Sequence, residues 1–431
     1  MVATRRTFLR STAATAASFA LSRHHLAAAS AAAFSVSGVR IPSDAWPWWR
    51  GPRFDNIVPS ANPPLNWSAT KNIQWKTPVP GRGHASPILW GDQILVPTAD
   101  EDRQILQMLS FDRSMGRRLW SAEIHRGGFM KKSEKNSHAS ATPACDGQRI
   151  FFPALYDDAL WLSAITFAGD LLWQKRIGGF IPSNGYASSP LIYKNAIIVA
   201  SDNTGEPCLA ALERGTGSLL WRSERPKADN FCSPTLALVA GRPQLVLCGA
   251  HMIASYNPEN GELIWHVESP TEVTACTPAF GDNFVFAGGN VPVRESICVR
   301  ADGQGNVTKT HVLWRSRKNV TYVPSPLLHE GLLYMINDGG IAHCIDASSG
   351  DEIYKERIGG DFSSSPLVVG NNIFVTNEKG ETTVLRLGKK FEVLTRNLLN
   401  EAVFATPVFI GSNIFFRTAQ HLICVIEKNP A

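Results

Sequence analysis

The chain has 431 residues, of which 44% are hydrophobic and 18% are charged, with 34 glycines and 27 prolines. This composition is too apolar and too weakly charged for a disordered protein, and it favours an all-β fold. The length allows one large core or two to three domains. The formal net charge of +5 suggests an acidic partner such as nucleic acid or a membrane, unless the excess cations lie in a segment of their own.

The first 33 residues have the features of an export signal. Arg5 and Arg6 precede Phe-Leu, a weakly apolar run covers 11–22, and small residues suited to cleavage follow over 26–33. The adjacent arginines resemble a twin-arginine signal, so we expect a periplasmic or secreted protein. The apolar run is too short to span a bilayer, and no other run approaches that length.

The same segment also explains the net charge. Residues 1–33 contain four arginines and no acidic residue, so the remaining chain has a formal charge near +1. Bulk charge then no longer supports a nucleic-acid partner, and we expect none.

An internal repeat predicts the fold. A Ser/Thr-Pro pair opens each of eight similar units, and the prolines of successive units are 40 to 56 residues apart. Each pair is followed by three apolar runs, a tight turn and a fourth run that usually ends in an aromatic residue. Four strands in about 45 residues indicate a β-propeller blade. The pairs are Ser86-Pro87, Thr142-Pro143, Ser189-Pro190, Ser233-Pro234, Thr277-Pro278, Ser325-Pro326, Ser365-Pro366 and Thr406-Pro407.

The ends of the repeat predict how the ring closes. The last unit stops after its third run, at 422–426, and an unassigned run with Trp75 lies at 72–77. Trp75 also precedes Pro87 by 12 residues, a spacing shared with most other units. We therefore expect an eight-bladed all-β propeller in which the N-terminal strand completes the last blade and removes two open sheet edges.

The turn Cys344-Ile-Asp-Ala-Ser-Ser-Gly-Asp-Glu-Ile-Tyr354 resembles the repeat of the PQQ-like (pyrroloquinoline quinone repeat) propeller family, which includes BamB-like scaffolds and quinoprotein dehydrogenases. The segment Trp46-Pro-Trp-Trp-Arg-Gly-Pro52 is similar to the start of its exported, cofactor-free branch. The resemblance implies that the tryptophans dock neighbouring blades. These are Trp75, Trp120, Trp173, Trp221, Trp265 and Trp314.

The family contains enzymes as well as scaffolds, so the sequence leaves activity open. A quinoprotein dehydrogenase needs a clamped quinone, Ca²⁺ held by several oxygen ligands and a carboxylate base. This chain has no adjacent cysteine pair, no C-x-x-C-H haem site and no metal-ligand spacing. We expect no cofactor and no metal. Pyrroloquinoline quinone with Ca²⁺ in an alcohol-type dehydrogenase is the alternative, and a hydrolase that uses residues at the channel mouth is a further one.

A ligand is expected at the mouth of the central channel, where the segments leading into the innermost strands meet. These segments are rich in polar and aromatic residues, and a long insertion between Trp120 and Pro143 joins the same face as a mobile, charged loop. His84 and His138 would be the proton carriers in any catalysis. The candidate ligand-binding residues are Arg82, His84, His138, Tyr186, Asp229, Asn230, Tyr322 and Asp361.

The predicted organisation is an export signal over 1–33, a lead-in segment over 34–70 packed on the ring, and the propeller over 71–431. The predicted function is a non-catalytic binding or scaffolding module of the cell envelope, with a protein or glycan as partner. We expect the protein to be a monomer.

Overall fold

The computed structural model describes residues 37–318 and 320–428. Arg5, Arg6 and the whole predicted export signal lie outside these ranges. Within them, all regular secondary structure is β-strand, and no helix is long and apolar enough to cross a membrane.

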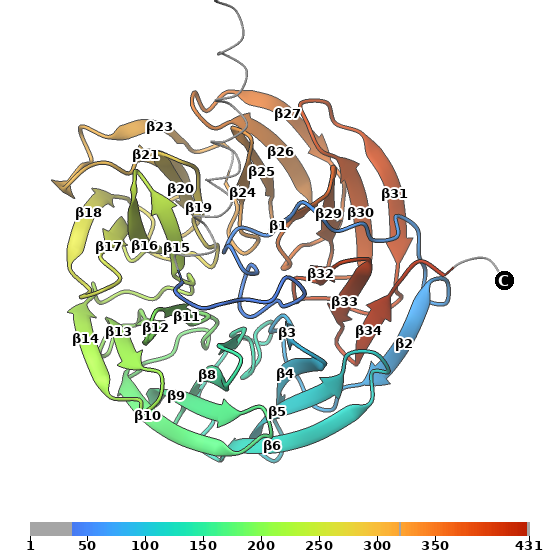
Figure 1. Cartoon of the computed structure of the whole chain (residues 1–431). Helices are drawn as coiled ribbons and strands as arrows, with labels where there is room; N and C mark the ends of the chain where they lie inside the picture. The colour runs from blue at the N-terminus through green and yellow to red at the C-terminus, as the bar shows by residue number, and fades with distance from the viewer. Residues whose placement is uncertain (1–36, 319, 429–431) are drawn as a thin grey trace, which may run out of the picture.

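Eight β-sheets stand in a ring around a central channel (Figure 1). Each sheet has four antiparallel strands that follow one another from the channel to the rim, and we number the blades 1 to 8 in the order of their Ser/Thr-Pro pairs. The all-β, eight-bladed propeller predicted from the repeat is confirmed.

The first four blades follow the sequence order. Blade 1 has β3 (Ile88–Trp90), β4 (Gln93–Asp100), β5 (Ile105–Asp112) and β6 (Arg118–Arg126); blade 2 has β7 (Ala144–Cys145), β8 (Arg149–Tyr156), β9 (Ala159–Thr166) and β10 (Leu171–Gly179); blade 3 has β11 (Leu191–Tyr193), β12 (Ala196–Ser201), β13 (Cys208–Glu213) and β14 (Leu219–Glu224); blade 4 has β15 (Thr235–Val239), β16 (Arg242–Gly249), β17 (Met252–Tyr256) and β18 (Leu263–Glu268). A short strand, β22 (Gly305–Asn306), pairs in parallel with the outer edge of β18.

The remaining blades repeat the pattern. Blade 5 has β19 (Ala279–Phe280), β20 (Phe284–Gly289), β21 (Glu295–Arg300) and β23 (Val312–Ser316); blade 6 has β24 (Leu327–His329), β25 (Leu332–Ile336), β26 (Ile341–Asp346) and β27 (Glu352–Arg357); blade 7 has β28 (Leu367–Val369), β29 (Asn372–Thr376), β30 (Glu381–Arg386) and β31 (Val393–Leu398); blade 8 has β32 (Val408–Ile410), β33 (Asn413–Arg417) and β34 (His421–Val425), with β2 (Ile73–Pro78) as its outer strand.

The strand β2 closes the ring as the sequence predicted. It runs antiparallel to β34, with Trp75 opposite Cys424 and Lys76 opposite Ile423. The first strand of the propeller therefore lies in the same sheet as the last, and no blade is left a strand short.

Burial decreases from the channel to the rim. All six residues of β12 are buried, whereas β2 alternates between half-buried and exposed residues. Inner strands are covered on both faces by neighbouring blades, and outer strands have one face in solvent. This arrangement accounts for the low charged fraction of the chain.

The outer tryptophans contact the following blade. Four of the six named above donate their indole N–H to a carbonyl in the outer turn of the next blade, at 2.9–3.2 Å: Trp75 to Arg113, Trp120 to Phe167, Trp173 to Arg214 and Trp314 to Ala347. Trp221 lies against Gly261 of the next outer turn. Trp265 differs, because its indole donates to Gln244 in its own blade while β22 lies along its strand.

The lead-in segment crosses the middle of the ring (Figure 1). Its backbone or side chains hydrogen-bond to the innermost strands, or to residues just before or after them, in seven of the eight blades. The short strand β1 (Ile57–Val58) pairs in parallel with β28, next to the channel. The chain then runs along blade 7, where the backbone N–H of Trp67 donates to the side-chain oxygen of Asn397 at 2.8 Å, and reaches β2 at the rim.

Candidate functional site

The central channel contains a cavity of about 370 Å³. Its wall comes from the segments that enter the innermost strands, and its floor is the lead-in segment. The cavity is therefore a pocket that opens toward one face of the ring, the face where the sequence predicted a ligand site.

Trp49 and Arg50 hold the floor in place. The Trp49 indole lines the cavity and donates to the Thr277 hydroxyl at 2.9 Å. The Arg50 guanidinium is buried and donates to the backbone carbonyls of Thr277 and Pro326 at 3.3 and 2.8 Å. Burial lowers the pKa of Arg50 to about 10, although nearby Asp55 opposes this shift. The side chain remains a cation at neutral pH and ties blades 5 and 6 to the floor.

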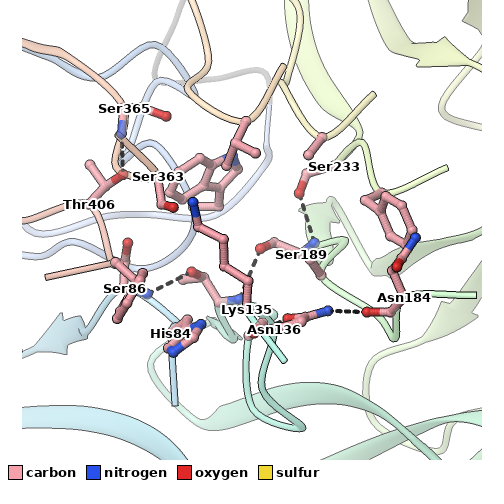
Figure 2. A pocket seen from close by; sticks show the side chains of 18 of the residues that line it. His84, Ser86, Lys135, Asn136, Asn184, Ser189, Ser233, Ser363, Ser365 and Thr406 are labelled. Atoms are coloured by element: carbon pink, nitrogen blue, oxygen red, sulfur yellow. Dashed lines mark hydrogen bonds between the residues drawn. The ribbon is translucent and has the colours of Figure 1, made fainter. Parts of the chain in front are cut away.

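The insertion between blades 1 and 2 covers part of the opening of the pocket, on the side opposite the floor. We call residues 127–143 the cover loop. Lys132 in this loop pairs with Glu101 of blade 1 at 3.2 Å, and Lys135 reaches Glu378 of blade 7 at 2.7 Å. Figure 2 shows Lys135 extended across the pocket. The sequence predicted a mobile, charged loop. The structure instead shows ion pairs that hold this loop at both sides of the opening.

The Ser and Thr residues of the eight Ser/Thr-Pro pairs surround the pocket, and most of them are linked to their neighbours by hydrogen bonds. In six of the eight junctions, the backbone N–H of the Ser or Thr in one blade donates to the hydroxyl oxygen of its counterpart in the next blade, at 2.9–3.0 Å (Figure 2). We call these residues the hydroxyl ring. Because the bond needs a short side chain with an acceptor oxygen, the ring gives a physical reason for the recurring Ser or Thr.

Two predicted site residues, His84 and Tyr322, line the pocket. The His84 ring stacks on Phe404 with centroids 4.4 Å apart. Burial, together with the cations Arg82, Arg417 and Lys132, lowers the pKa of His84 to about 3. Burial likewise raises the pKa of Tyr322. Both side chains are therefore neutral at physiological pH.

His138 belongs to the cover loop itself and lines a small recess that is separate from the channel pocket and that it shares with Tyr186. Its ring packs on Phe129 with centroids 4.1 Å apart. Burial lowers the pKa of His138 to about 4, although the carboxylate of Glu101 opposes this shift. The two histidines face separate spaces, so the structure does not bring them together as a pair.

The other predicted site residues lie around or below the mouth. Tyr186 is buried, and its hydroxyl donates to the Ala200 carbonyl at 2.9 Å. Asn230 is also buried, and its amide donates to Asp202 and to the Cys248 carbonyl. These two residues support the blades rather than the pocket wall.

Arg82, Asp229 and Asp361 lie at the surface near the mouth. Arg82 contacts the Glu134 carbonyl and lies 3.6 Å from a Glu101 oxygen, so it holds the cover loop. Asp229 is half-buried and Asp361 is exposed. None of these three lines the pocket in the described ranges.

Several lining residues were not among the candidate ligand-binding residues predicted from the sequence. They are Trp49 from the lead-in segment, Lys135 and Asn136 from the cover loop, Phe231 and Phe404, and six residues of the hydroxyl ring. The eightfold recurrence of Ser or Thr was the available signal for the ring, since a fixed residue type at the start of every innermost strand must share one environment. No comparable signal places Trp49, because its position depends on how the lead-in segment crosses the ring.

A family profile described as outer membrane protein assembly factor BamB matches residues 107–323 and 306–390, about two thirds of the chain. The chain belongs to this family. No curated protein matches the chain significantly in sequence.

Solved structures show the same fold as this BamB-family chain at low identity. BamB from Moraxella catarrhalis has a TM-score of 0.57 with 12% identity, over 82% of this chain and 99% of that one. Quinohemoprotein alcohol dehydrogenase from Comamonas testosteroni has a TM-score of 0.64 with 10% identity, over 94% of this chain and 84% of that one. The computationally designed Ika8 protein has a TM-score of 0.57 with 10% identity, over 86% and 99%. BamB, an alcohol dehydrogenase and a designed protein share this architecture, so the fold alone does not decide whether the chain has an activity.

The pocket of this BamB-family protein does not fit pyrroloquinoline quinone with Ca²⁺. In the described ranges no carboxylate lines the pocket and no group of acidic, His or Cys residues is arranged to hold a metal ion. The acidic quinone would meet one lining cation, Lys135, which is already paired with Glu378. The thiols of Cys232 and Cys248 have sulfurs 3.6 Å apart, but both are buried and neither lines the pocket.

Proposed function

We propose that the protein is a non-catalytic binding module of the cell envelope, exported by the twin-arginine pathway, with its ligand site in the closed channel. The observation that carries the proposal is that the protein's own lead-in segment makes a blind pocket out of the channel. A concave, largely pre-formed pocket with aromatic walls and a few polar groups is the usual form of a small-ligand site. Membership of a family described as an assembly factor supports an interaction role in the envelope.

The chemistry of the lining supports binding rather than turnover. With its pKa near 3, His84 is a weak base at neutral pH, because a general base works best when its pKa lies near the operating pH. In the described part of the chain His84 makes a ring contact with Phe404 and no hydrogen bond that would activate a lining serine. The protein is accordingly proposed to work without a cofactor or metal.

Site-specific photocrosslinking tests the proposal. Benzoylphenylalanine at Tyr322, inside the pocket, is expected to crosslink a specific envelope component when the purified protein is irradiated with the solubilised envelope fraction. The same probe at Leu219, on the outer strand of blade 3 with 60% of its side chain exposed, is the control. Identical products from both positions, or none at Tyr322, would contradict a pocket site.

The dehydrogenase alternative has its own readout. The purified protein is titrated with pyrroloquinoline quinone and Ca²⁺ and assayed for dye-linked alcohol oxidation. We expect no stoichiometric binding and no turnover. Alcohol oxidation that depends on both additions would overturn the non-catalytic proposal.

A further inference from the structure

The hydroxyl ring offers the pocket more hydrogen-bond donors than the protein uses. Six of its members line the cavity, and five of these accept a backbone N–H through the hydroxyl oxygen. A hydroxyl that accepts in this way still has its own proton to donate. Within residues 37–318 and 320–428, none of the six donates that proton to a protein acceptor. The lining members are Ser86, Thr142, Ser189, Ser233, Ser365 and Thr406.

Ser86 is the sharpest case. Ser86 is 3% exposed and lines the pocket. Its hydroxyl is buried and has no hydrogen-bond partner within the described ranges. A buried hydroxyl left unpaired carries a desolvation penalty. An oxygen-bearing ligand in the pocket would remove this penalty, so Ser86 points to a ligand with acceptor oxygens.

The charge of the lining selects among such ligands. As far as the chain is described, Lys135 is the sole charged side chain on the wall, and Glu378 neutralises it at 2.7 Å. His84 adds a neutral imidazole, whose ring N–H has no hydrogen-bond acceptor among residues 37–318 and 320–428. A carboxylate or phosphate entering this space would lose its hydration without an unpaired cation to compensate. The pocket therefore favours an uncharged ligand.

The remaining walls are aromatic. Trp49 forms the floor, and Phe231, Tyr322 and Phe404 contribute further rings to the lining. Such surfaces favour a ligand with an apolar face in addition to its oxygens. A sugar ring has both, since hydroxyl and ring oxygens project from its edge while C–H groups cover its faces. A cavity of about 370 Å³ lies at the lower end of the range for small-ligand pockets and suits one or two such rings.

We propose that the channel pocket binds a neutral sugar, as the terminal residue or two of a glycan. The hydroxyl ring donates to the sugar oxygens, Ser86 gains its missing partner, and the aromatic rings contact the sugar faces. This inference rests on the proposed function, because it names the ligand class of the same pocket.

Titration calorimetry and ligand-observed NMR on the purified protein test the inference. The probes are glucose, N-acetylglucosamine and cellobiose as neutral sugars, glucuronate as an acidic sugar, and trialanine as a peptide. We expect at least one neutral sugar to bind, and glucuronate to bind more weakly than glucose. Ser86→Ala should weaken binding about two- to tenfold, the usual effect of one hydrogen bond. Ser349→Ala, in the exposed outer turn of blade 6, is the matched control and should leave binding unchanged.

A blocking variant locates the site. Ala187 lines the pocket, so Ala187→Trp is expected to fill it and abolish sugar binding. Circular dichroism and thermal unfolding establish that this variant is folded, and Ala187→Phe replaces it if it is not. Sugar binding that persists in a folded, blocked variant would overturn the assignment.

The outcomes separate this inference from the proposed function. If no neutral sugar binds, or if glucuronate or trialanine binds best, the sugar assignment is overturned. A specific crosslink at Tyr322 in that case would still support the pocket as a binding site. Loss of both sugar binding and crosslinking would overturn both.

Discussion

His84 shows how the pocket controls a single side chain. Its imidazole is packed against Phe404 and lies within reach of the charges of Arg82, Arg417 and Lys132. Burial and these cations both disfavour a second proton, so the pKa falls to about 3. In the unfolded chain the same group has its ordinary pKa of about 6.5.

This difference makes folding stability depend on pH. As the pH falls from about 6.5 toward 3, the unfolded chain takes up a proton that folded His84 does not, so the free energy of unfolding decreases by up to about 1.4 kcal/mol per pH unit. His84→Gln should flatten this part of the profile, while His138 retains a similar contribution. Urea unfolding between pH 4.5 and 8 measures the slope. His251→Gln, at a histidine with 55% of its side chain exposed, is the control, and equal slopes for both variants would refute the role of His84.

The sequence could place a residue near the channel where its position in the repeat decides its environment, whereas its role in ligand binding stays a prediction. His84 and Tyr322 line the pocket because both enter an innermost strand. Tyr186 and Asn230 enter equivalent strands but turn into the blades, where a carbonyl or a carboxylate binds them. The repeat gives the backbone position of a residue, and the side-chain direction depends on local packing that one sequence does not display.

At the scale of elements, every blade has a β-bulge at the same point of its outer strand, and the residue beside it is aromatic in seven blades and Thr395 in blade 7. The pairing between the third and fourth strands shifts at this point in all eight sheets. In blade 6, Tyr354 pairs with Cys344 and Glu352 with Ile345, so the intervening Ile353 is skipped. Bulges bend a strand and change the direction of its side chains. The bulge therefore belongs to the geometry that places Trp75, Trp120, Trp173 and Trp314 beside the next blade.

The turn of the next blade must leave room for that aromatic ring. Gly350, with φ of +80°, closes the outer turn of blade 6, and a Cβ there would lie 2.7 Å from the Trp314 ring. Gly331 in the same blade has φ of +78° with nothing within 4 Å. Alanine at either position adds the strain of a left-handed backbone, about 1–2 kcal/mol. Gly350→Ala adds overpacking of about 1–3 kcal/mol, so it should destabilise the protein more than Gly331→Ala in denaturant unfolding. Equal losses would show that the contact between blades contributes little.

The sequence predicted these elements well because each blade is a local unit. Strands, turn glycines and outer aromatics all recur within about 45 residues. The parallel additions β1 and β22 were not predicted, since each pairs with a strand outside its own repeat. Two-residue strands held by distant partners have no local hydrophobic period to detect.

At the scale of the whole molecule, the two N-terminal pieces have different tasks. The strand β2 closes the ring at the rim, and residues 37–58 close the channel at the centre. The sequence predicted the first, because the last repeat lacked a strand. It placed the second only as a packed segment, because nothing periodic connects Trp49 or Arg50 to the innermost strands they touch.

Two deletions separate these tasks. Deletion of residues 37–58 removes the Trp49 floor and the bonds of Arg50, but it leaves every blade with four strands. This variant should remain a folded ring with a lower unfolding midpoint and should lose the pocket ligand.

Deletion of residues 71–79 removes β2 and exposes the edge of β34, which can then pair with another chain. This variant should lose cooperative unfolding and associate. Thermal unfolding and light scattering compare the two. If the variant without β2 is as stable and as dispersed as the intact protein, closure by β2 does not hold the ring together. If the variant without residues 37–58 fails to fold, the central segment is part of the core rather than a floor laid across a self-sufficient ring.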